Sequence, residues 1–73
     1  MESASVTIQV NGEPREISGA ITVASLLREL NIKSDRVAVE LNLEIMERQA
    51  FETRYLQEGD RLEILSFIGG GAD

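Results

Sequence analysis

The sequence contains no cysteine and no histidine. Without cysteine the chain can form no disulfide, thiolate nucleophile or thiolate metal site. Without histidine it lacks the commonest general base and metal ligand near neutral pH. Its serines therefore have no imidazole to activate them, and its carboxylates are scattered. We predict that the protein is not an enzyme and binds no metal or cofactor, and that a pair such as Glu40 and Glu44 is solvated surface.

Basic residues and long apolar runs are also scarce. The chain has 7 Lys and Arg against 13 Asp and Glu, a formal net charge of -6. Phosphate backbones and anionic lipids repel such a chain, so we expect neither nucleic acid nor membrane as a partner; a basic protein surface suits it better. No apolar run approaches the ~20 residues of a transmembrane helix. Residues 1–4 lack the basic and apolar start of a secretory signal, so a cytoplasmic protein is expected.

The length allows one small domain. The chain has 73 residues, of which 42% are hydrophobic and 27% charged. A domain of this size buries only roughly 60% of its unfolded surface, so its core must be thin. It has no room for a second domain or a deep substrate cleft. The composition and the glycines near the end predict a folded domain over residues 1–68 and a flexible tail over residues 69–73.

The N-terminal segment is typical of a β-hairpin. Residues 6–10 alternate apolar and polar side chains, as a strand with one buried face does. Asn11-Gly12 tolerates positive φ and suits a type I′ turn. The returning strand is predicted over residues 13–17, and Pro14 places it at a sheet edge because proline cannot donate a ladder hydrogen bond.

One short helix and further strands are predicted next. Thr22 is expected to cap a helix that ends near Asn31. Its apolar face has the spacing 0, 3, 4, 7 and consists of Val23, Leu26, Leu27 and Leu30. Strands are predicted over residues 37–41, 44–48 and 61–68. Between the last two strands the apolar residues follow no regular period. The expected core anchors there are Phe51, Tyr55 and Leu56.

This order of elements predicts the α+β class. It fits a β-grasp fold, with a mixed sheet of four to five strands and one main helix on one face. In that arrangement the first and last strands lie side by side and parallel at the centre of the sheet.

Three glycines, Gly69-Gly70-Gly71, directly follow the last predicted strand. Without Cβ atoms they could thread a narrow slot where side chains would clash. Extended, they would reach on the order of 10 Å beyond the folded body. A frayed end is the simpler interpretation. The alternative is a chain end presented to the active site of a partner, so that chemistry is done to this protein and not by it.

Two apolar residues are predicted on the open face of the sheet. If Leu62 and Ile64 face the helix, strand alternation directs Leu65 and Phe67 to the other side. That side should be polar. Its other expected members are Thr7, Gln9, Ala38, Glu40 and Glu63. Three interpretations are open: residues 49–56 fold over the two apolar side chains, or they are scattered exposed apolar residues without a function, or they and the adjoining Ile68 bind a partner beside the tail.

Several short motifs then share one order along nearly the whole chain. They are Val10-Asn11-Gly12-Glu13, Thr22-Val23 with Leu26-Leu27, Val37-Ala38-Val39-Glu40-Leu41-Asn42, Glu44-Ile45 with Arg48, Gly59-Asp60-Arg61-Leu62-Glu63-Ile64, and Phe67-Ile68-Gly69-Gly70-Gly71. In this order and spacing the sequence resembles the ThiS family, the small sulfur carriers of thiamine biosynthesis.

The resemblance implies a ubiquitin-like carrier of sulfur on its terminal glycine. In that family an ATP-dependent adenylating enzyme, related to ubiquitin-activating enzymes, converts the glycine carboxylate to an acyl-adenylate. Sulfur from a donor such as a cysteine desulfurase then replaces AMP and leaves a thiocarboxylate. Thiazole synthase takes this sulfur for the thiazole ring. The implied site is Gly71 with Gly70 and Gly69, and ATP is used by the partner enzyme and not held by the carrier.

One departure from the family pattern is that Ala72 and Asp73 follow Gly71. A carboxyl group held in a peptide bond cannot be adenylated, so the resemblance implies that these two residues are removed first. Three alternatives stay open at this point. They are the small subunit of molybdopterin synthase, a ubiquitin-like modifier joined to lysine, and a β-grasp interaction module without covalent chemistry.

Overall fold

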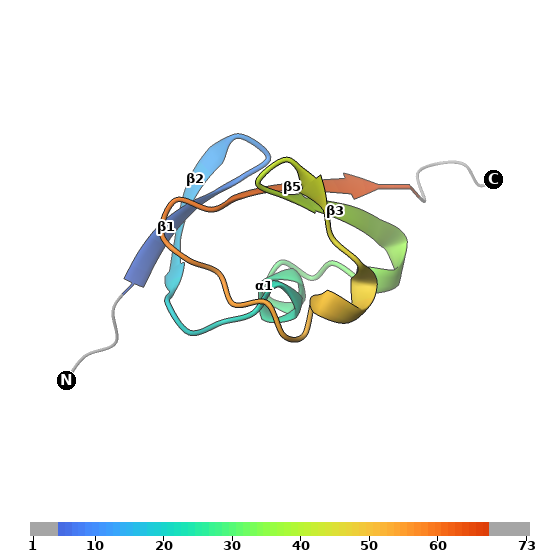
Figure 1. Ribbon diagram of the computed structural model, residues 1–73, viewed down its shortest axis with the longest axis horizontal. Helices are drawn as coiled ribbons and strands as arrows, with labels where there is room; N and C mark the ends of the chain where they lie inside the picture. Colours follow the sequence, from blue (N-terminus) through green and yellow to red (C-terminus); the bar gives the residue numbers. More distant parts are fainter. Residues whose placement is uncertain (1–4, 68–73) are drawn as a thin grey trace.

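The structure is a computed structural model that describes residues 5–67. Within this range a five-stranded sheet packs against one α-helix, which lies on one face of the sheet (Figure 1). The elements, in chain order, are β1 (Ser5–Val10), β2 (Glu13–Ser18), α1 (Val23–Glu29), the 3₁₀ helix η1 (Ser34–Arg36), β3 (Val37–Leu41), β4 (Glu44–Ile45), the 3₁₀ helix η2 (Arg48–Ala50) and β5 (Arg61–Ser66).

The sheet has the strand order β2-β1-β5-β3-β4. Strands β1 and β5 are parallel neighbours at its centre, whereas the other neighbouring pairs are antiparallel. The predicted α+β class and β-grasp order are therefore confirmed. Pro14 lies opposite Gln9 in the edge strand β2, as its missing N–H requires.

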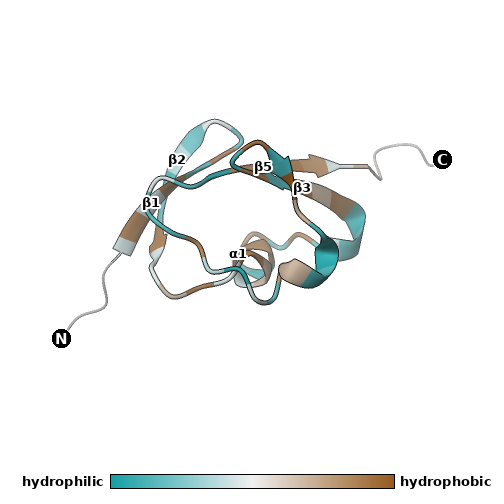
Figure 2. Ribbon diagram, in the orientation of Figure 1, coloured by the Kyte–Doolittle hydropathy of each residue, from teal (hydrophilic) through white to brown (hydrophobic). Residues whose placement is uncertain are grey.

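The core lies between α1 and the inner face of the sheet. The hydroxyl of Thr22 accepts a hydrogen bond from the N–H of Ser25 (3.1 Å), which confirms the predicted N-cap. Asn31 adopts a positive φ of 61° directly after the helix. Figure 2 shows hydrophobic residues on α1 and on the central strands. The buried apolar residues are Ile8, Ile17, Val23, Ala24, Leu26, Leu27, Val37, Val39, Leu41, Phe51, Leu56 and Leu62.

The predicted strand over residues 44–48 is wrong beyond Ile45. Strand β4 has two residues, and the chain then turns into η2. The N–H of Phe51 donates to the carbonyl of Arg48 (3.0 Å), and this turn directs Phe51 into the core, where it is 3% exposed. An extended chain over residues 44–48 would have carried it past the core.

Two of the three residues predicted to anchor this segment in the core do so. Phe51 and Leu56 are buried, but Tyr55 is 55% exposed, so its predicted role as a core anchor is wrong. The main chain of Tyr55 forms an isolated bridge with Thr22. In this extended segment neighbouring side chains point to opposite sides, and Leu56 occupies the inner one.

Three predictions for the chain ends concern residues outside the described range. These are the last residue of the predicted strand 61–68, the predicted tail over residues 69–73, and the N-terminal residues 1–4. Strand β5 ends at Ser66, and Phe67 is the last residue described. Within residues 5–67 no helix is both long and apolar enough to cross a bilayer.

A buried carboxylate fixes the start of β5. Asp60 is 6% exposed, and it accepts hydrogen bonds from the side-chain amide of Asn42 (3.0 Å) and the N–H of Gln57 (2.8 Å). Its second oxygen also lies 3.3 Å from the guanidinium of Arg54. Asn42 in turn accepts from the N–H of Arg61 (2.9 Å). Asp60 therefore joins the turn before β5 to the turn after β3.

We expect Asp60→Ala to lower the free energy of unfolding by about 2–4 kcal/mol, because it removes a buried carboxylate together with two charge-assisted hydrogen bonds and an ion pair. This is a large part of the ~5–15 kcal/mol typical of a domain. Urea denaturation followed by circular dichroism measures the change. The matched control is Glu63→Ala, which removes an exposed carboxylate from β5 and should change stability by less than about 0.5 kcal/mol. Equal effects of the two variants would contradict the role of Asp60.

Candidate functional site

Strand β5 leads the chain toward the glycines, and its neighbours hold it on both sides. On one side the N–H of Gln9 donates to the carbonyl of Asp60 (2.9 Å), and that of Asn11 donates to Leu62 (2.8 Å). On the other side β3 pairs with β5 from Leu62 to Ser66. A strand fixed at the centre of the sheet gives the following residues a defined point of departure.

The side chains of β5 alternate between the two faces as predicted. Leu62 is 1% exposed beneath α1, whereas Leu65 and Phe67 are 54% and 60% exposed on the open face. The alternative in which residues 49–56 cover these two side chains is wrong. Phe51 and Leu56 instead belong to the core between the helix and the sheet.

The open face holds a third large apolar residue that sequence reasoning missed. Ile45 on β4 lies opposite Glu40, and Glu40 lies opposite Glu63, so the three side chains share the open face. Ile45 is 69% exposed. Alternation on the two sides of the turn after β3 could have predicted this position. The strand expected over residues 44–48 was not aligned with a neighbouring strand, so the face on which Ile45 lies was not assigned.

We call Ile45, Leu65 and Phe67 the docking patch. Ala38 lies opposite Leu65 on the same face. The carboxylates of Glu40 and Glu63 stand beside these residues, and Glu16 lies further away on β2, opposite Thr7. Exposed apolar side chains with charged residues beside them are typical of a protein interface. The matching partner surface has an apolar pocket, with basic residues opposite Glu40 and Glu63.

The described residues bring together no catalytic constellation. Glu44 pairs with Leu41, whereas the adjacent register pair joins Glu40 and Ile45, so the two glutamates point to opposite faces of the sheet. Within residues 5–67 no group of three or more acidic side chains could hold a metal ion. What the site offers is an apolar and acidic surface beside a chain end.

The other predicted site residues lie beyond the described part of the chain. Ile68, predicted to bind a partner, and Gly69, Gly70 and Gly71, predicted to bear the chemistry, fall outside residues 5–67. The same holds for Ala72 and Asp73. Their roles stay predictions.

Comparison with known proteins connects this geometry to a family. Residues 8–71 match the model of the ThiS family. The sulfur carrier protein ThiS of Thermus thermophilus is 34% identical over 64 residues, which cover 88% of this chain and 98% of that protein. A thiazole synthase of Paramagnetospirillum magneticum is 48% identical over 64 residues. That match covers 88% of this chain, but this chain spans only 20% of that protein's length.

A solved structure has the same fold. The crystal structure of the thiamine biosynthesis protein ThiS from Geobacter metallireducens superposes with a TM-score of 0.77 at 38% sequence identity. The alignment covers 90% of this chain and all of that one. The segment matched by the family model ends at Gly71, so it includes the three glycines and leaves out Ala72 and Asp73.

Proposed function

The chain belongs to the ThiS family, and we propose on that basis that it is a sulfur carrier of thiamine biosynthesis, loaded as a thiocarboxylate on Gly71. The observation that carries the proposal is the match over residues 8–71, which joins the β-grasp domain to the three glycines. A central strand that leads directly toward these glycines supports it. The chain is then the carrier and other proteins perform the catalysis.

The chemistry explains why a carrier needs a free terminal carboxylate. A carboxylate is a poor electrophile. Attack of its oxygen on the α-phosphate of ATP expels pyrophosphate and gives an acyl-adenylate, in which AMP is a good leaving group. Sulfide (HS⁻) released from the donor attacks the carbonyl carbon, forms the C–S bond and displaces AMP. The resulting thiocarboxylate is a nucleophilic and transferable sulfur that cannot diffuse away from the protein.

Three partners follow from this sequence of reactions. The first is an adenylating enzyme related to ubiquitin-activating enzymes, which supplies ATP chemistry. The second is a sulfur donor such as a cysteine desulfurase. The third is thiazole synthase, and its inclusion is supported by two proteins of that name in which a segment of about one fifth of their length resembles this chain.

The docking patch is the proposed contact for the adenylating enzyme. Leu65 and Phe67 lie at the end of β5, on the face away from α1. A partner that covers this face would receive the residues after Phe67 at the edge of the contact. We propose that Ile68 extends the patch, and that the peptide bond between Gly71 and Ala72 is cut before loading.

A genetic test separates this function from its nearest rival. Expression of this chain, ended at Gly71, is expected to restore growth without thiamine to a bacterial strain that lacks its own ThiS. The same expression should not restore molybdenum-enzyme activity to a strain that lacks the small subunit of molybdopterin synthase. The reverse result would assign the chain to the molybdopterin pathway. Adducts of higher mass on cellular proteins, seen on a blot of the tagged chain, would favour a modifier.

A further inference from the structure

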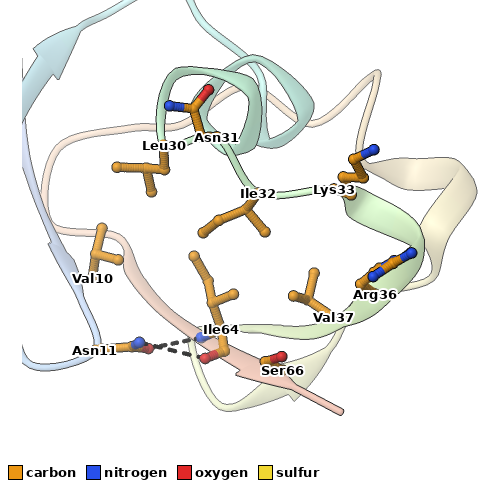
Figure 3. Close-up of a pocket in the computed structure, with 10 residues that line it drawn as sticks. All are labelled: Val10, Asn11, Leu30, Asn31, Ile32, Lys33, Arg36, Val37, Ile64 and Ser66. Carbon is orange, nitrogen blue, oxygen red and sulfur yellow. Dashed lines mark hydrogen bonds between the residues drawn. The ribbon is translucent and has the colours of Figure 1, made fainter. Parts of the chain in front are cut away.

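A groove lies on the opposite side of the sheet from the docking patch. It has a volume of about 620 Å³ and opens between the end of α1, the segment after it and the C-terminal half of β5 (Figure 3). Its lining residues are Val10, Asn11, Leu30, Asn31, Ile32, Lys33, Arg36, Val37, Ile64 and Ser66. Neither the sulfur chemistry nor the docking patch uses any of these side chains.

The floor of the groove is apolar and only half-buried. Val10, Leu30, Ile32 and Ile64 pack against the core and remain partly exposed. Figure 3 shows these four side chains pointing toward one another across the groove. Further burial of this apolar surface by an incoming side chain would be favourable, at roughly 25 cal/mol per Å².

One wall of the groove is an open strand edge. Strand β1 pairs with β5 only at Arg61 and Leu62, because the chain turns away at Asn11. Beyond this point the side chain of Asn11 takes the place of main-chain groups of β1 on the edge of β5. Its oxygen accepts from the N–H of Ile64 (2.7 Å), and its amide lies 3.4 Å from the carbonyl of Ile64.

The next main-chain groups on this edge belong to Ser66. Ser66 lies opposite Val37 in β3, while the N–H of Phe67 donates to the carbonyl of Arg36 (3.2 Å). Main-chain groups alternate between the two edges of a strand. The N–H and C=O of Ser66 therefore face the groove, where no residue in the range 5–67 pairs with them.

The rim of the groove is cationic in a chain of net charge -6. Lys33 and Arg36 lie together on one side of it (Figure 3). Within residues 5–67 neither forms an ion pair, whereas Arg28 and Arg54 pair with acidic residues. The charge of this rim is thus opposite to that of Glu40 and Glu63 beside the docking patch, and it would attract an acidic segment.

We propose that this groove binds an extended acidic segment of a partner protein, which adds a short strand to β5 at Ser66. The segment places an apolar side chain over Ile32 and Ile64 and an acidic one beside Lys33 and Arg36. Main-chain pairing gives affinity, and the groove and its rim give specificity. The contact leaves the open face free, so the chain could hold one protein here while the docking patch engages another.

The test uses the full chain and a capped eight-residue peptide of alternating valine and threonine, with two glutamates at one end. In ¹⁵N-resolved NMR titrations we expect shifts at Ile32, Lys33 and Ser66, and slower hydrogen exchange of the Ser66 amide. Lys33→Glu combined with Arg36→Glu should weaken binding by about tenfold, because two attractions between exposed charges become two repulsions. Arg15→Glu on the edge strand β2 is the matched control and should leave binding unchanged.

Four results would overturn the proposal. They are no binding at millimolar peptide, equal binding of a peptide with lysines in place of the glutamates, shifts confined to the open face, and unchanged Ser66 exchange in the bound state. Deletion of residues 68–73 is a further control. If this deletion alone shifts the groove amides, the chain's own end occupies the groove and a partner segment does not. The outcome is independent of sulfur loading, because no adenylating enzyme is present.

Discussion

A chain that ends at Gly71 is expected to be converted to its thiocarboxylate by the adenylating enzyme, ATP and a sulfur donor, whereas the 73-residue chain should stay unmodified. The difference is close to all or none, because in the longer chain the carbonyl of Gly71 belongs to an amide and has no carboxylate oxygen that could attack ATP. Asp73 also adds a negative charge where an anionic nucleotide must approach. Intact-mass measurement reports the replacement of one oxygen by one sulfur.

Two controls make this result specific. Omission of ATP should abolish the mass change, and a chain ended at Gly70 should react much more slowly, because its carboxylate reaches ~3.3–3.6 Å less far from the domain. An unchanged mass for the chain ended at Gly71, with an adenylating enzyme proven active on another carrier, would contradict the carrier function. Loading of the 73-residue chain without loss of Ala72 and Asp73 would contradict the choice of Gly71.

Phe67→Asp is expected to weaken docking to the adenylating enzyme by about 2 kcal/mol or more, which is roughly a thirtyfold rise in the dissociation constant. An aromatic side chain 60% exposed in the free protein has most to gain from burial in a partner. Leu65→Asp should act in the same direction. Because both side chains are exposed, we expect the free energy of unfolding to change by less than about 0.5 kcal/mol.

Isothermal titration measures docking, and urea denaturation measures folding. Gln9→Asp is the matched control, since it adds the same charge to the same face but lies on β1, away from the end of β5. It should weaken docking far less than Phe67→Asp. If Phe67→Asp unfolds the domain, or docks like the wild type, the patch is not the contact surface.

Local patterns in the sequence predicted most of the fold. Alternation over residues 6–10 and 37–41 predicted β1 and β3, and Asn11-Gly12 predicted the turn between β1 and β2. The three glycines, together with the absence of cysteine and histidine, predicted that the chemistry takes place at the chain end and not in a catalytic site of this chain. These features depend on one residue and its near neighbours, so they can be read without the tertiary structure.

Segments in which the apolar residues follow no regular period were predicted less well. The strand expected over residues 44–48 ends at Ile45, since burial of Phe51 requires the turn of η2. Tyr55 was expected inside, but Leu56 takes the inner position. Ile45 was missed as a member of the docking patch because its place follows from its register opposite Glu40.

The fold class, the alternation of β5 and the glycines after it can be read from the amino-acid sequence, because each depends on local spacing and residue type. The surfaces that these features form depend on the three-dimensional fold. Strand pairing joined Ile45 to Leu65 and Phe67 on one face. On the other, the early turn of β1 left the edge of β5 open beside Lys33 and Arg36. Each surface combines residues that are distant in the chain, and only the packing of the folded chain brings them together.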